Sequence, residues 1–461
     1  GIVLFTRNLG TPEEVAALAE TLRARAAVPP LIGIDQEGGR VSRMPLPGMV
    51  FPGNMALGLL DDPDRTRSVT RAIGEQLAAV GVDVDFAPSV DVNNNPRNPI
   101  IGVRSFGEDP ERVARHGVAA VTGFRDAGIL PVVKHFPGHG DTSRDSHLEL
   151  PVQLADRARL EAVELPPFRA AIAAGAPAVM TTHIMFPALD PDFPATLSRR
   201  ILTDLLRNEL GFNGLIVTDC LEMNGIAAHW SPEETAVLAV EAGADMLLVC
   251  HTRETQARMY AALLEAVRTG RLTEERVRAS AARVARAREL VAGVREAAPE
   301  PSRISAPVYR ELERETADAC LAAWGTVPEG VVPFRQNEPV LVAGASSPAW
   351  DFAASLRECG FDARVGAATE PLPGAATQVV WLALPDEPFA AGIPTPEVAG
   401  MLAAHPRAVV AAVREPYCLE HYPDNVPRIA AWGALPVHLQ ALARWLSGAR
   451  VAPLLPWGRG G

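Results

Sequence analysis

The sequence contains almost no lysine. It has 43 Lys and Arg residues among its 461, and Lys134 is the only lysine, so arginine carries nearly all of the positive charge. The formal net charge of −12 argues against nucleic acid or an anionic membrane surface as the main partner. No apolar run approaches the roughly 18 residues of a transmembrane helix, so none is predicted.

Cysteine is also scarce. The five cysteines are an odd number, and no two of them form a CxxC pair, so we expect isolated reduced thiols rather than a disulfide framework or a zinc knuckle. The opening apolar run "GIVLF" has neither a basic segment nor a cleavage site, so no signal peptide is predicted. We therefore expect a cytoplasmic protein, or a secreted one if an N-terminal segment is missing.

Short apolar runs alternate with longer amphipathic stretches over the first half of the chain. Continuous apolar strands that alternate with helices predict a parallel sheet covered on both faces. Most of these strands run into polar residues, as expected for a (β/α)8 TIM-like barrel; a doubly wound open sheet is the alternative. The predicted strands are 2–5, 31–35, 84–88, 131–135, 178–183, 215–219 and 246–250.

The chain is long enough for two domains. A stretch rich in Pro, Ala and Ser, "REAAPEPSRISAP", follows a long predicted helix and is typical of a linker. Beyond it, the apolar segments "EPVLVAGAS", "TQVVWLALP" and "RAVVAAVRE" predict further strands. We therefore expect a barrel domain over 1–296, a linker over 297–306 and a smaller α/β sandwich domain over 307–461.

The segment from Lys134 to His147 concentrates reactive side chains. Its fourteen residues include three histidines, two aspartates and the single lysine. Asp145 and His147 are two positions apart, so the carboxylate could orient the imidazole as a general acid/base. Because the chain uses arginine instead of lysine at every other such position, the presence of Lys134 suggests a pocket that needs a compact ammonium group.

Two other interpretations of this segment remain open. It could be a solvated loop of ordinary polar residues. It could also bind zinc or iron, although it lacks a HExxH helix and the cationic lysine would oppose a metal. The candidate metal ligands are His135, His139, Asp141, Asp145 and His147.

Further polar residues follow other predicted strands. Asp219 ends the run "GLIVTD", although an aspartate there could equally be a helix N-cap. Asp35 ends "LIGID", and the two glycines after it allow a sharp turn. Together with Arg43, Arg104 and His183, these residues predict a pocket suited to a polyhydroxylated substrate.

Four blocks of the sequence resemble glycoside hydrolase family 3. They are "IDQEGGRVSR", "RSFGEDP", "KHFPGHGDTSRDSH" and "IVTDCLEM", and the Asp-x-His loop resembles that of the family's β-N-acetylglucosaminidase branch. The likeness runs over most of residues 1–290. The end of the chain resembles, less specifically, the second α/β domain of two-domain members.

The resemblance implies a role for each matching residue. Asp219 would be the nucleophile of a retaining enzyme, and His147, paired with Asp145, would be the acid/base in place of the usual second carboxylate. The implied ligands of the −1 sugar are Asp35, Arg43, Arg104, Lys134 and His135, with His183 nearby.

The implied activity is that of an exo-β-N-acetylglucosaminidase without metal or cofactor. Its expected substrates are glycans that contain N-acetylglucosamine, from cell-wall muropeptides or chitin oligomers. Other activities stay open: a broader β-glycosidase or a phosphorylase on the same scaffold, a non-catalytic sugar-binding protein, and a metal-dependent hydrolase.

The sequence departs from the family pattern in two places. Only seven barrel strands are predicted where the family has eight, so either the barrel lacks its first strand or an N-terminal segment is missing. The C-terminal part is short, and it offers no acid that we could assign to the acid/base role found there in β-glucosidase members.

Overall fold

The chain forms two compact units. The first comprises Gly1–Glu37, Val41–Met49 and Asp61–Ala306, and the second comprises Gly38–Arg40, Val50–Leu60 and Pro307–Gly461. The computed structural model describes residues 1–44, 50–142, 150–295, 299–327, 329–344, 346–367, 378–384, 393–449 and 455–457.

The first unit is built on a parallel sheet. Within the described residues it has seven strands, and each pairs with the next along the chain. This unbroken order is that of a β/α barrel, whereas a doubly wound sheet reverses its order at a switch point, so the predicted barrel is confirmed. The strands are β1 (Ile2–Leu4), β2 (Ile32–Ile34), β3 (Val84–Asp85), β4 (Leu130–Phe136), β5 (Ala178–Thr181), β6 (Leu215–Cys220) and β7 (Met246–Leu248).

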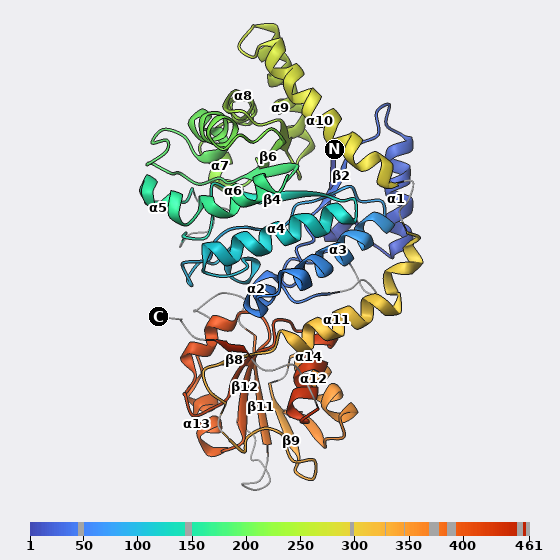
Figure 1. Cartoon of the computed structure of the whole chain (residues 1–461), viewed down its shortest axis with the longest axis vertical. Helices are drawn as coiled ribbons and strands as arrows, with labels where there is room; N and C mark the ends of the chain where they lie inside the picture. Colours follow the sequence, from blue (N-terminus) through green and yellow to red (C-terminus); the bar gives the residue numbers. More distant parts are fainter. Residues whose placement is uncertain are drawn as a thin grey trace. The chain divides into compact units, whose positions relative to one another are not determined.

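Helices connect these strands, and side-chain caps fix where several of them begin. Thr11 accepts a hydrogen bond from the backbone of Glu14 at the start of α1, and Asp62 and Asp109 cap α3 and α4 in the same way. Helices α3 and α4 lie side by side (Figure 1). The helices of this unit are α1 (Pro12–Ala24), α3 (Pro63–Ala79), α4 (Pro110–Asp126), α5 (Arg157–Ala162), α6 (Leu165–Ala173), the π-helix η4 (Arg200–Glu209), α7 (Asn224–Ala227), α8 (Pro232–Ala242), α9 (Arg253–Arg268) and α10 (Glu274–Arg295), with short 3-10 turns η1 (Thr6–Asn8), η2 (Gly102–Arg104), η3 (Ala195–Leu197) and η5 (Pro301–Ser305).

Buried carboxylates mark the amino ends of the barrel strands. Asp83, just before β3, accepts from the backbone N–H of Ile32 at 2.9 Å and from Arg23 at 2.9 Å. Asp245, just before β7, forms an ion pair with Arg207. These ion pairs stabilise the rim formed by the amino ends of the strands. The polar residues predicted at the strand ends belong to the opposite rim.

An apolar cavity of about 490 Å³ lies between β1 and β7. In the described part of the chain, β1 pairs only with β2, and β7 pairs only with β6. The sheet is therefore open between β1 and β7, and its interior borders the cavity there. Its lining includes Val3, Phe86, Val217, Met246 and Tyr260.

The second unit is a mixed α/β sheet with helices on both faces, which confirms the predicted smaller α/β domain. Its strand order is β10-β9-β11-β12-β13-β8-β14, and only the β13–β8 pair is antiparallel among the strands described. Helices α12 and α14 cover one face of the sheet and α13 the other (Figure 1). The strands are β8 (Ala322–Trp324), β9 (Val340–Ala343), β10 (Ala363–Gly366), β11 (Gln378–Ala383), β12 (Ala408–Ala412), β13 (Arg428–Ala430) and β14 (Leu455–Trp457), and the helical segments are α2 (Asn54–Leu60), α11 (Pro307–Ala319), α12 (Ser347–Glu358), α13 (Pro396–Ala404), η6 (Pro416–His421) and α14 (Pro436–Leu446).

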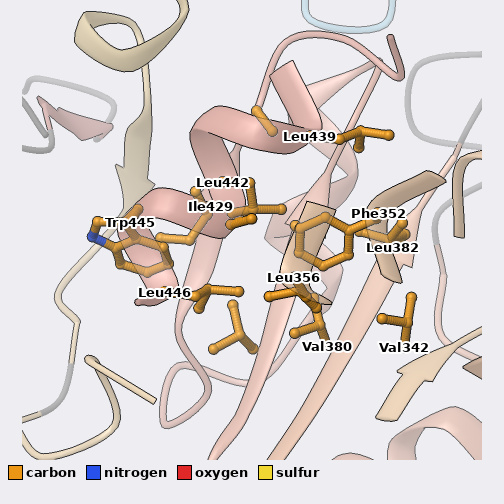
Figure 2. Packing of buried hydrophobic residues seen from close by; sticks show 14 of the residues in the cluster. Val342, Phe352, Leu356, Val380, Leu382, Ile429, Leu439, Leu442, Trp445 and Leu446 are labelled. Carbon is orange, nitrogen blue, oxygen red and sulfur yellow. The ribbon is translucent and has the colours of Figure 1, made fainter. Parts of the chain in front are cut away.

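The core of the second unit lies between its sheet and the α12/α14 layer. Phe352 and Leu356 of α12 point toward the sheet strands, and Leu442 of α14 packs beside them (Figure 2). All three side chains are fully buried, so each contributes about 1.5–3 kcal/mol of burial free energy. None of the described helices combines the length and hydrophobicity that crossing a membrane would require.

Candidate active site

The polar residues predicted at strand ends lie on one rim of the barrel. Asp35 follows β2, Lys134 lies in β4 and Asp219 lies in β6. The carboxyl ends of parallel barrel strands meet at a common rim. Three residues from distant parts of the sequence are therefore brought to the same end of the sheet.

Lys134 is buried and bonded to two carboxylates. Its Nζ lies 2.8 Å from Asp35 Oδ1 and 2.7 Å from Glu37 Oε1. Burial by itself would lower the pKa of Lys134, but the charges of Asp35 and Glu37 outweigh that effect and raise it. The lysine is therefore a permanent ammonium group at neutral pH.

Arg104 reaches the same cluster from η2. Its Nε and one terminal nitrogen donate to the two oxygens of Glu37 at 3.0 and 2.8 Å, which is a bidentate pair. The terminal nitrogen also lies 3.3 Å from His135 Nε2. Burial would raise the pKa of Glu37, yet Arg104 and Lys134 lower it to about 2. Glu37 thus joins both cations.

His135 forms a carboxylate–imidazole pair with Asp91. Its Nδ1 lies 2.7 Å from Asp91 Oδ2, and an ionised carboxylate can only accept, so Nδ1 carries the proton. Asp91 also accepts from the backbone N–H of His139 at 2.7 Å and from the Ser89 hydroxyl at 2.8 Å. Although burial opposes ionisation, His135 holds the pKa of Asp91 well below its ordinary value. The pair fixes the orientation of the His135 ring.

His139 is buried in the loop that follows β4. Its Nδ1 lies 3.1 Å from the Thr142 hydroxyl, and its backbone carbonyl accepts from Asn98 at 2.7 Å. Burial, reinforced by the nearby charge of His135, lowers the pKa of His139 to about 4. Across the described residues, no three His, Cys, Asp or Glu side chains are arranged so that they could hold a metal ion.

Asp219 stands at the end of β6 as an ionised carboxylate. Its Oδ1 accepts from the backbone N–H of Cys220 at 2.7 Å. Burial would raise the pKa of Asp219, but the side chains of His183, His135 and Lys134 lower it overall. Asp219 therefore lies within electrostatic range of His135 and Lys134 on β4.

His183 holds the backbone next to Asp219. Its Nε2 lies 2.9 Å from the carbonyl oxygen of Cys220, and its Nδ1 lies 2.8 Å from the Thr196 hydroxyl. Both ring nitrogens therefore bond to the protein, and the side chain is buried. This arrangement suits a residue that orients Asp219.

The remaining predicted site residues are less well defined. The backbone N–H of Arg43 donates to Gln36 at 2.6 Å, and the Arg43 Nε is buried without a hydrogen-bond partner in the described part of the chain. Asp145 and His147 lie outside the described residues.

Two residues of the site, Glu37 and Asp91, were not singled out in the sequence. Glu37 stands two positions after Asp35, inside the glycine-rich turn "DQEGG". Asp91 interrupts the otherwise apolar segment "FAPSVDV" that follows β3, and a charged residue in an apolar strand-end segment was the available signal. Neither pattern identifies the cation or imidazole that the carboxylate contacts.

Asp85 adds a buried carboxyl group to the cluster. Its Oδ1 accepts from the Gln36 backbone at 2.9 Å, and its buried Oδ2 has no hydrogen-bond partner among the described residues. Burial, with the charges of Asp35 and Glu37, raises the pKa of Asp85 well above its ordinary value despite Lys134. Burial therefore favours the neutral form of Asp85 more than that of the other carboxyl groups beside Lys134.

The assembled groups can bind a hydroxyl-rich ligand and attack it. Arg104 and Lys134 offer charged donors, Asp35 offers a half-exposed acceptor, and Asp219 offers an ionised carboxylate that could form a covalent bond to carbon.

Known proteins share this architecture. Residues 1–287 match the model for the glycosyl hydrolase family 3 N-terminal domain. The β-hexosaminidase A of Pseudoalteromonas piscicida is 38% identical over 370 residues, which are 74% of this chain but 61% of that relative. The β-hexosaminidase of Alkalilimnicola ehrlichii is 40% identical over 260 residues, 55% of this chain and 74% of that relative.

A solved structure extends the likeness to both units. The glycoside hydrolase family 3 β-N-acetylglucosaminidase of Paenibacillus sp. str. FPU-7 superposes with a TM-score of 0.87 at 39% identity, covering 98% of this chain and 91% of that one. Because the family model matches more than half of the chain, and its strand-end residues gather on one barrel rim, the chain belongs to glycosyl hydrolase family 3.

Proposed function

We propose that the protein is a retaining exo-β-N-acetylglucosaminidase, with catalysis carried by the barrel. The single observation that carries this proposal is the ionised Asp219 carboxylate beside the cationic and imidazole groups of β4. Relatives named β-hexosaminidase at 36–40% identity support the same activity.

The proposed reaction is a double displacement. An Asp219 oxygen bonds to C1 of the terminal sugar while the bond from C1 to the leaving oxygen breaks, and His147 gives that oxygen its proton. A water oxygen then bonds to C1, the bond to Asp219 breaks, and the water's proton passes to His147. Two inversions at C1 give net retention. The role of His147, with Asp145 as its partner, rests on the resemblance of their loop.

The sugar ligands follow from the contacts around Lys134. Asp35 uses one oxygen for Lys134, and its side chain is 26% exposed, so it can accept from a sugar hydroxyl. Lys134, Arg104 and Arg43 would donate to hydroxyl or acetamido oxygens. His135 would face the sugar with its Nε2 edge, which Arg104 also approaches at 3.3 Å, because Asp91 occupies its Nδ1. We assign His183 the positioning of Asp219.

The proposed substrates are glycans that end in β-linked N-acetylglucosamine, from cell-wall muropeptides or chitin oligomers. The test is hydrolysis of 4-nitrophenyl N-acetyl-β-glucosaminide beside the matched glucoside, with and without phosphate. Preference for the acetamido sugar and no effect of phosphate are expected. Faster turnover with phosphate would identify a phosphorylase, equal rates a broader glycosidase, and sugar binding without turnover a binding protein.

The covalent step has its own test. A 5-fluoro N-acetylglucosaminyl donor slows hydrolysis of the intermediate, so the labelled peptide can be mapped. Label on Asp219 is expected. Label on another carboxylate would overturn the assignment of the nucleophile.

A further inference from the structure

Glu37 is a charged residue at the centre of the site that no step of the reaction uses. Its side chain is only 1% exposed, whereas that of Asp35 is 26% exposed. Both of its oxygens already accept charged hydrogen bonds, Oε1 from Lys134 and Arg104 and Oε2 from Arg104. A buried carboxylate with occupied oxygens has little capacity left for a sugar hydroxyl.

The two cations that Glu37 joins would otherwise repel each other. Lys134 and Arg104 share one carboxylate oxygen as acceptor, at 2.7 and 2.8 Å, so their charges are close together in a buried site. Like charges at such a separation disfavour ionisation of the weaker one. An ammonium group can lose its proton, whereas a guanidinium cannot, so Lys134 is the group that would respond.

Resting on the proposed function, we propose that Glu37 is a positioning residue: it holds Lys134 and Arg104 together as sugar-binding donors without touching the sugar itself. Asp35 then remains available to the substrate, because Glu37 supplies the second anion that Lys134 needs. Asp219, on the same rim, and Asp85, whose pKa burial raises, are further carboxyl groups that interact with Lys134.

The competing interpretation is a purely structural ion pair, and the chain supplies a matched control. Asp83 is likewise buried and accepts from both the Arg23 guanidinium and a backbone N–H, but at the amino ends of the strands. Asp83→Asn removes an equivalent charge from the rim away from the sugar. A structural effect would appear in both variants, whereas a positioning effect would appear only in Glu37→Gln.

The single lysine makes the first test specific. Protein grown with lysine labelled with ¹³C at Cε gives one lysine side-chain signal, and its chemical shift against pH reports the pKa of Lys134. We expect the titration of Glu37→Gln to move to lower pH than in the wild type, while Asp83→Asn leaves it unchanged. An identical titration in wild type and Glu37→Gln would overturn the proposal, and this result does not depend on enzyme activity.

The second test uses kinetics on 4-nitrophenyl N-acetyl-β-glucosaminide. A hydrogen bond to a charged group contributes about 1.5–3 kcal/mol, or roughly 10- to 100-fold, so KM should rise by that factor in Glu37→Gln, with a smaller change in kcat. Glu37→Asp keeps the charge on a side chain that is one methylene shorter, so its KM should lie between those of the wild type and Glu37→Gln. If Glu37→Gln does not fold, the Glu37→Asp variant must still show both shifts, and wild-type values in it would overturn the proposal. A wild type without hydrolysis would reject the proposed function and leave the lysine titration as the test.

Discussion

Lys134 Nζ and Asp35 Oδ1 lie 2.8 Å apart, although 99 residues separate them in the chain. The contact joins the ends of β2 and β4. The lysine is buried there, and carboxylates stabilise its charge in place of water. A compact ammonium group fits this position because it can bond to Asp35 and Glu37 with separate protons.

Lys134→Arg should therefore weaken substrate binding although it conserves charge. A planar guanidinium cannot occupy the volume of the ammonium without displacing Asp35 or Glu37. We expect KM for the nitrophenyl substrate to rise by about 10-fold or more, with the fold retained by circular dichroism. Wild-type kinetics in this variant would contradict the interpretation of the single lysine.

Asp219→Ala should abolish turnover and preserve sugar binding. Removing a nucleophile leaves the hydrogen-bonding groups around Lys134 intact, so we expect a loss in kcat of about 10⁴-fold or more. Binding of N-acetylglucosamine, measured by calorimetry, should change little. Near-normal turnover would show that another residue attacks C1.

His147→Ala should affect substrates according to their leaving groups. A poor leaving group needs a proton as its bond to C1 breaks, whereas an activated nitrophenolate does not. We expect a large loss on chitobiose and a much smaller loss on the 4-nitrophenyl glycoside. Equal losses on the two substrates would argue against the acid/base role.

His438 should make the second unit sensitive to acid. It is buried near the start of α14, neither ring nitrogen has a hydrogen-bond partner in the described part of the chain, and burial lowers its pKa to about 4. As pH falls, His438 binds a proton near pH 6.5 in the unfolded chain but only near pH 4 in the folded chain. The free energy of unfolding therefore falls as pH drops through this window.

The matching variant is His438→Leu, which removes the titrating group. From pH 7 to pH 5 the wild type should lose about 2 kcal/mol of unfolding free energy through His438, and the variant should lose that much less. Denaturant unfolding at the two pH values measures the difference. An equal loss in both proteins would show that His438 does not control this response.

Much of the fold could be predicted from hydrophobic patterning. All seven predicted barrel strands exist, although several are shorter than expected, such as β3, which is only Val84–Asp85. In the second unit the strongly apolar strands β9, β11 and β12 were anticipated. The strands β8, β10, β13 and β14 were not named, because small, charged or proline residues weaken their apolar runs.

The site was predicted by residue type more than by contact. Asp35, Lys134, His135 and Asp219 were named because each stands at a strand end, and the barrel brings such ends together. The partners that set their charge states, above all Glu37 and Asp91, were missed. A pKa depends on burial and on neighbours in space, and neither can be obtained from spacing along the chain.

The sequence alone determined the alternation of strands and helices, the family and the reactive residue types, because these depend on local pattern and motif. Tertiary structure decided which carboxylate meets which cation. It raised the pKa of Asp85 and lowered that of Glu37 nearby, and it turned His183 toward the backbone next to Asp219. The physical reason is that charge and hydrogen bonding act over a few ångströms of space, and folding alone brings those groups within that range.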